Sequence, residues 1–164
     1  MLDSLLQQIK DNTLTNLHLV NKNVSTEEIT LLCEALKSNT SVKSLNILYI
    51  KIKDTDLQTI IEMLKVNKTI QMLTLTDTGI TSKYIPDLAK VLETHPQITY
   101  LSINGLEIES SESLQLAFTN LIKSNTNLTH ISMTSLDFSG EQGKYLAKAI
   151  DSHVFLLNFD HKYL

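Results

Sequence analysis

Hydrophobic residues along this chain follow two alternating spacings. Six-residue segments carry apolar side chains at positions 1, 4 and 6. Positions 4 and 6 are two residues apart, which is the spacing expected of a strand with one buried face. The segments start at Leu14, Val42, Ile70, Ile98, Leu128 and Val154. The starts are 28, 28, 28, 30 and 26 residues apart, and such regular spacing indicates an internal repeat.

Between these segments the spacing becomes that of a helix. Leu57, Ile60, Ile61 and Leu64, for example, fall at i, i+3, i+4 and i+7, which places them on one face of an α-helix. The same rhythm recurs at 29–36, 57–64, 85–92, 114–121 and 143–150. Each unit is therefore predicted to be a strand, a loop, a helix and a turn. One unit cannot bury both its strand face and its helix face, so neighbouring units must stack.

The ends of the helices are also predictable. Three asparagines stand three residues after the last apolar residue of a predicted helix, namely Asn39, Asn67 and Asn125. Asparagine tolerates the left-handed conformation that often ends a helix, so we expect that conformation here. His95 and Pro96 take this place in the third interval. Pro86 predicts that the helix of the same interval begins late, near Ile85.

A 28-residue unit of the form LxxLxL resembles the leucine-rich repeat, of the longer helical type found in ribonuclease inhibitor. The stretches LLQQIKDN (5–12), ALKSNTSVKSLNI (35–47) and MLKVNKTIQMLTL (63–75) resemble the C-terminal leucine-rich domain of tropomodulin, over about residues 2–159. The resemblance implies an α/β solenoid with a curved parallel sheet of about six short strands and helices on the convex side. We expect a single domain over residues 1–164, with a helix at 2–10 covering its N-terminal end.

Many leucine-rich repeats place an asparagine at position 9, where its side chain satisfies the turn after the strand. This chain has other residues there, namely Lys22, Ile50, Thr78, Leu106 and Leu136. We therefore expect the amides of those turns to bond to main-chain groups or water.

Tropomodulin caps the pointed ends of actin filaments, which makes actin binding or pointed-end capping one functional hypothesis. The family's extended N-terminal half and the helix after its last strand fall outside residues 1–164, and the chain has no arginine. The sequence therefore favours a broader hypothesis, a non-catalytic scaffold that binds an unidentified protein, with actin as the alternative. A composition rich in lysine, asparagine and isoleucine is typical of AT-rich genomes and adds the hypothesis of a microbial effector with a eukaryotic-like repeat.

Charge and hydropathy restrict the partners and the location. The net charge is −4 and all 14 basic residues are lysines, so the concentrated basic face of a nucleic-acid binder is missing. No apolar run approaches the ~18 to 20 residues of a membrane span, and the N-terminus does not have the features of a secretory signal. We expect a cytoplasmic protein, or one delivered into a host cytoplasm if it is an effector, that binds neither nucleic acid nor membrane.

Catalytic and metal-binding patterns are missing from the sequence. Cys33 occupies the buried stripe of its predicted helix and is interpreted as a core residue. His18 and His130 lie on strands four units apart, or ~19 Å, too far to share a metal ion. The known short motifs of metalloproteases, redox enzymes, nucleotide-binding enzymes and serine hydrolases do not occur. We therefore predict no enzyme activity, no metal and no cofactor.

A partner is expected on the concave face, where positions 3, 5 and 7 of each repeat alternate with buried positions. These positions carry mostly small uncharged residues and a few large ones. We expect the large ones to anchor a protein, because aromatic residues and methionine are enriched at interfaces. The predicted anchors are Leu48, Tyr49, Met72, Tyr100 and His130. We also expect the last segment, 154–164, to present an unpaired strand edge open to self-association.

Overall fold

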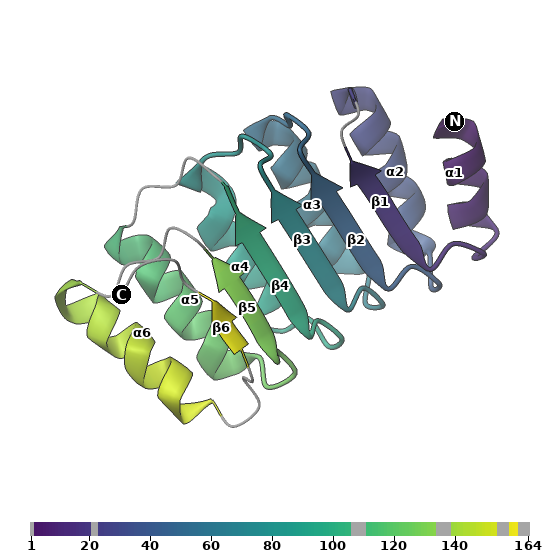
Figure 1. Ribbon diagram of the computed structural model, residues 1–164. Coiled ribbons are helices and arrows are strands. Elements are labelled where there is room, and N and C mark those ends of the chain that lie inside the picture. The colour runs from purple at the N-terminus through teal and green to yellow at the C-terminus, as the bar shows by residue number, and fades with distance from the viewer. Residues whose placement is uncertain (1, 21–22, 106–110, 134–138, 154–157, 161–164) are drawn as a thin grey trace.

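Six parallel strands form one sheet in the computed structural model (Figure 1), which describes residues 2–20, 23–105, 111–133, 139–153 and 158–160. The strands are β1 (Asn16–Val20), β2 (Ser44–Leu48), β3 (Met72–Thr76), β4 (Tyr100–Asn104), β5 (His130–Met133) and β6 (Asn158–Asp160). Their order in the sheet is their order in the chain. In the first five predicted segments the apolar residues at positions 4 and 6 fall within β1 to β5, and Phe159 of the sixth falls within β6. Residues 154 and 157 of the sixth segment lie outside the described residues.

The repeat fixes the register of the sheet. Leu17 pairs with Leu45, and Leu45 pairs with Leu73. Each strand residue therefore lies beside the residue 28 positions further along the chain, or 30 positions between β4 and β5. All three leucines are at most 2% exposed. Aliphatic side chains from successive strands therefore stack as continuous rows on the inner face of the sheet.

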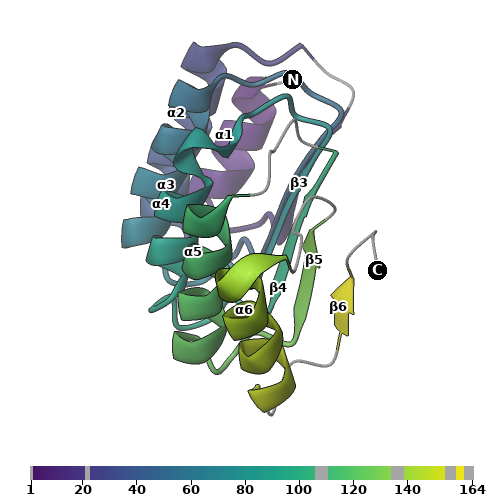
Figure 2. The same cartoon turned by 90° about the vertical axis from the view of Figure 1, so that its left-hand side faces the viewer.

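The helices cover one face of the sheet only, as the side view in Figure 2 shows. They are α1 (Leu2–Lys10), α2 (Thr26–Ser38), α3 (Asp54–Val66), α4 (Ile85–Leu92), α5 (Glu112–Ser124) and α6 (Gly140–Ser152). Packed helices need about 8 to 10 Å each, whereas paired strands need only about 4.8 Å. The sheet must therefore curve, with the strands on the concave side and the helices on the convex side.

Two helix predictions are confirmed. The helix expected at 2–10 is α1, which buries Ile9 completely and packs Leu2, Leu5 and Leu6 against the core. Pro86 stands in the first turn of α4, which begins at Ile85 after a short 3₁₀ turn. Proline is tolerated there because the first helical amides have no acceptor within the helix.

The predicted left-handed ends of the helices are wrong. Asn39, Asn67 and Asn125 have φ angles of −73°, −66° and −95° and an extended backbone. Each is buried, and its side chain bonds to the main chain of two successive repeats. The role of the asparagine at this position therefore depends on its carboxamide, which can donate and accept hydrogen bonds at the same time. It does not depend on the tolerance of asparagine for positive φ.

Asn67 shows how this contact works. Its Nδ2 donates to the carbonyls of Leu36 and Asn39 in the preceding repeat, at 2.7 and 3.1 Å. Its Oδ1 accepts from the amides of Thr69 and Ile70 in its own repeat, at 2.9 and 3.1 Å. One buried side chain thus satisfies the end of one helix and the start of the next strand.

Two histidines continue this series, which we call the turn ladder: Asn39, Asn67, His95, Asn125 and His153. The Nε2 atoms of His95 and His153 donate to the carbonyls of Asn67 and Asn125, each at 2.9 Å. The other ring nitrogen, Nδ1, is buried without a partner in both residues. Histidine therefore replaces only half of the asparagine contact.

The turns after the strands use main-chain partners, as expected from the missing asparagine at position 9. The amides of Tyr49 and Ile52 donate to the carbonyls of Thr76 and Thr78, at 2.9 and 3.0 Å. Thr78 itself is buried, and its hydroxyl has no partner. Three of the five position-9 residues, 22, 106 and 136, lie outside the described part of the chain.

We predict that Asn67→Ala lowers the free energy of unfolding by about 3 kcal/mol, because it leaves several buried main-chain groups without partners. Urea unfolding followed by circular dichroism measures this loss. Asn120→Ala is the matched control, since Asn120 is exposed on α5 and its replacement should change stability by less than about 0.5 kcal/mol. Equal effects of the two changes would show that the ladder contributes little.

We also predict that stability falls in mild acid through His95. Burial lowers the pKa of this imidazole, and the charge of Lys68 lowers it further, against an opposing effect of the hydrogen bond to Asn67. The unfolded chain then binds a proton at about pH 6.5 that the folded chain does not. Stability is therefore intact above that pH and decreases as the pH falls below it.

His95→Asn removes this titration and supplies the missing acceptor. The variant should lose less stability than the native chain between pH 7.5 and pH 5.5 in urea unfolding. Asn120→Ala, a change at an exposed position without a titratable group, should leave the pH dependence as it is. An unchanged pH dependence in His95→Asn would contradict the assignment.

Candidate protein-binding surface

The concave face of the sheet is less open than its alternating pattern predicts. Ser44, Asn46 and Ser102, which were expected to face a partner, are only 7%, 8% and 4% exposed. They lie on the central strands β2 and β4, where side chains of both neighbouring strands cover small residues. In the outer strand β1, the equivalent Asn16 and His18 are exposed. On the central strands Met72, Tyr100 and His130 are therefore the large side chains that reach the surface, and the smaller ones around them are buried or half-buried.

Three of the predicted anchors form one group at the amino ends of their strands. Met72 pairs with Tyr100, and Tyr100 pairs with His130, on adjacent strands. The rings of Tyr100 and His130 stack, with centroids 5.6 Å apart and planes 29° from parallel. Met72 is exposed, and the two rings are half-buried. We call Met72, Tyr100 and His130 the anchor group.

Hydrogen bonds of the neighbouring residue Thr129 hold the anchor group in place. The Nδ1 atom of His130 lies 3.0 Å from the hydroxyl of Thr129, which in turn donates to the carbonyl of Thr99 at 3.1 Å. This chain of contacts restricts the rotation of the imidazole and, through the stack, that of the phenol ring. A partner would therefore meet an apolar surface that is already ordered.

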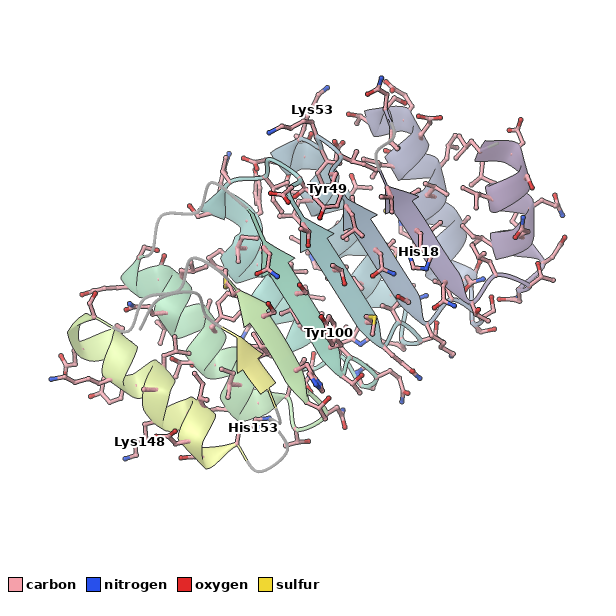
Figure 3. All side chains as sticks on the ribbon, in the orientation of Figure 1. His18, Tyr49, Lys53, Tyr100, Lys148 and His153 are labelled. Carbon is pink, nitrogen blue, oxygen red and sulfur yellow. The ribbon has the colours of Figure 1, made fainter. Side chains whose placement is uncertain are left out.

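Leu48 and Tyr49 lie at the opposite end of the strands. On β2, Ser44 lies beside Met72 of the anchor group. Tyr49 is five residues after Ser44, which is ~16 Å along an extended strand. Figure 3 shows Tyr49 near the carboxyl end of β2 and Tyr100 near the amino end of β4. The five predicted anchors therefore do not make one group, because a strand's length separates this pair from the other three.

Polar residues fill the space between the two ends. The Nδ2 atom of Asn104 donates to the hydroxyls of Ser102 and Ser132, each at 2.9 Å. Thr74 and Thr76 are half-buried in the neighbouring strand. These groups are already hydrogen-bonded or shielded, so the middle of the face offers few new polar contacts.

Tyr49 has a feature that sequence reasoning missed. Its φ angle is +57°, in the left-handed region that bulky residues avoid, and 57% of its surface is exposed. Asp77 and Gly105, at the same place in the next two repeats, have φ angles of +51° and +64°. The glycine at 105 was the available signal, because it marks a repeat position where glycine is the unstrained choice.

The other chemistry-bearing residues lie apart. Burial raises the pKa of the Cys33 thiol to about 12, with a smaller contribution from Glu34, which supports its interpretation as a core residue. No three metal-ligating side chains converge within the described residues. The described helices include none that is long and apolar enough to cross a bilayer.

The convex face carries ion pairs and scattered apolar residues. Lys37, Lys65 and Lys90 each pair with a glutamate three residues away, at 2.6, 2.5 and 2.9 Å. Leu116 and Tyr145, on the adjacent helices α5 and α6, are 46% and 47% exposed. These features were not predicted as a binding site, and they provide controls for one on the concave face.

The stacked strand and helix units, the in-register sheet and the one-sided helix layer define a leucine-rich repeat solenoid. The family model of the TMOD/LMOD leucine-rich domain matches residues 1–155. The chain therefore belongs to the tropomodulin and leiomodin leucine-rich domain family, which confirms the resemblance in the sequence. No curated protein matches the chain.

Solved structures agree with this assignment. One is the leiomodin-1 actin-binding site 2, with a TM-score of 0.76 and 25% identity, covering 92% of this chain and 90% of that one. Another is the C-terminal domain of a Caenorhabditis elegans tropomodulin, with a TM-score of 0.74 and 15% identity, covering 93% and 92%. The second shows the shared fold alone.

We predict that Tyr49→Asn raises the free energy of unfolding by about 0.5 to 1 kcal/mol, because asparagine tolerates positive φ better than tyrosine. Tyr145→Asn removes another exposed tyrosine, 47% exposed, from the regular helix α6 and should give no gain. Thermal unfolding of both variants provides the measurement. A gain in neither variant would show that Tyr49 is unstrained.

Proposed function

We propose that this domain is a non-catalytic protein-binding module and that its partner is actin, bound through the concave face. The observation that carries the proposal is the similarity to actin-binding site 2 of leiomodin-1, over nine-tenths of both chains. Membership of the same family supports it. Such a role would place the domain in the cytoplasm.

The anchor group is the part of the face best suited to binding. Interfaces gain most of their energy from a few large side chains, with aromatic residues and methionine enriched among them. Met72, Tyr100 and His130 provide such side chains from three adjacent strands. Because the stacked rings are already ordered, little conformational entropy is lost when a partner covers them.

Leu48 and Tyr49 form a second contact point at the other end of the face. Tyr49 is the most exposed of the predicted anchors. A partner that reached both ends would span the polar middle of the sheet, which favours a broad protein surface over a short peptide. Actin, a large globular protein, meets that requirement.

Charge contributes little to this mode of binding. The anchor group and the exposed residues of β1 carry no carboxylate and no lysine, and the chain has no arginine to form bidentate ion pairs. Binding through this face should therefore depend weakly on ionic strength. The hypothesis of a microbial effector rests on composition alone and stays a prediction.

The test is binding to purified actin by the chain with Met72→Ala and Tyr100→Ala combined. Truncation of such anchors typically costs about 1 to 4 kcal/mol, so affinity should fall at least about fivefold. Co-sedimentation with filaments and titration of labelled monomers measure this loss. Stability should fall only slightly in the same variant, because Met72 is exposed and Tyr100 is half-buried.

Leu116→Ala is the matched control on the convex face and should bind actin as the native chain does. Charge reversal at Lys37, Lys65 and Lys90 tests the convex helices directly. Loss of binding in those variants, together with full binding in the Met72 and Tyr100 variant, would overturn the concave assignment. Absence of binding to monomers and filaments would overturn actin as the partner.

A further inference from the structure

The outer edge of β1 is open to another strand. β1 pairs with β2 on one side, and the sheet order places no described strand on its other side. In a parallel sheet the main-chain groups of successive residues hydrogen-bond alternately to the strand on one side and to the strand on the other. About half of the amide and carbonyl groups of β1 therefore point away from β2. The edge is five residues long, and no turn or loop of the described residues forms a main-chain hydrogen bond to those groups.

The usual protections of an edge strand are missing here. Strand edges are commonly blocked by proline, by lysine, by a bulge or by a covering helix. β1 has the sequence NLHLV, with none of these residues. The helix α1 lies in the helix layer beside α2 rather than across the strand, as Figures 1 and 2 together show.

A hollow of about 400 Å³ lies beside this edge, between α1, β1 and α2. Four apolar side chains line it: Leu2, Leu19, Val24 and Leu32. Leu19 pairs with Ile47 of β2, and both belong to one row of buried side chains. If another strand paired with the outer edge of β1, its residue opposite Leu19 would point into the hollow.

The rim of the hollow is acidic. Asp3 and Glu28 line it, and the carboxylate of Glu28 is held by the amide of Ser25 at 2.8 Å. Residues 1–38, which end with α2, contain five carboxylates and three lysines, a net charge of −2 within the chain's −4. This end of the solenoid therefore favours a positively charged partner.

We propose that the β1 edge and its hollow form a second docking site, which takes an extended segment of a partner protein with one large apolar side chain flanked by lysine or arginine. The main-chain groups of β1 provide the pairing, the hollow takes the apolar side chain, and Asp3 and Glu28 attract the basic residues. Strand addition of this kind obtains affinity from main-chain bonds and specificity from the side-chain pocket. This site is separate from the anchor group and does not depend on actin as the partner.

The probe is a blocked seven-residue peptide with a central leucine between valines and threonines and a lysine at each end. It is added to the isotope-labelled full chain and followed by the amide chemical shifts. We expect saturable shifts in β1 and around the hollow, with slowed hydrogen exchange of β1 amides. The same peptide with glutamate at both ends should bind at least about threefold more weakly.

Three variants test the parts of the site. His18→Pro removes an amide from the middle of β1, at a position where an edge strand tolerates proline, and should abolish binding. Asp3→Lys should weaken binding about threefold, whereas Asp87→Lys, a matched change on the exposed first turn of α4, should not. The combined Met72→Ala and Tyr100→Ala variant should bind the peptide normally, which separates this site from the concave face.

Circular dichroism shows whether His18→Pro folds. If it does not, the peptide with alternate N-methylated residues makes the same test from the ligand's side and should fail to bind. Absence of saturable shifts with the lysine peptide, or equal binding of its N-methylated form, would overturn the proposal. So would a concentration-dependent dimer that His18→Pro abolishes, because the occupant of the edge would then be a second copy, paired through β6.

Discussion

The buried carboxamide of Asn67, bonded to the repeats on either side of it, shows the constraint on which the rest of this fold depends. Every helix of a solenoid ends with carbonyls that have no partner within the helix, and every strand begins with free amides. In this chain the helix of one repeat and the strand of the next meet at the same buried turn. A single side chain that donates and accepts there satisfies both, and it sets the distance between repeats.

The register of the sheet follows from that contact. Because the ladder residues recur every 28 or 30 residues, the strands that follow them lie side by side without slippage, and Leu17, Leu45 and Leu73 form one continuous row. A shift of one residue would turn every buried leucine toward solvent. The ladder and the hydrophobic row therefore favour the same alignment. The two histidines are the weaker members of the series, since each leaves one ring nitrogen buried without a partner.

The same regularity separates scaffold from function on the surface. Positions that make contacts between repeats hold asparagine or histidine in every copy, whereas the position of Met72, Tyr100 and His130 holds small polar residues in the first two repeats, and the position of Tyr49 holds aspartate and glycine in the next two. Tyr49 even occupies a position whose backbone suits glycine or asparagine better. A bulky exposed side chain in the left-handed region is a candidate functional feature, which supports the proposal that Tyr49 contacts a partner.

The sequence by itself determined the strands, the helices, their order and the buried rows, because spacings of two and 3.6 residues are local consequences of strand and helix geometry. It also located the late start of α4, since proline restricts its own neighbourhood. It did not determine the role of Asn39, Asn67 and Asn125, whose partners lie about 28 residues away and exist only when repeats stack. It also could not show that Ser44, Asn46 and Ser102 are buried, or that the rings of Tyr100 and His130 stack. Those outcomes were decided by the curvature and stacking of the sheet, which bring distant residues into contact and cover small side chains with the larger ones beside them.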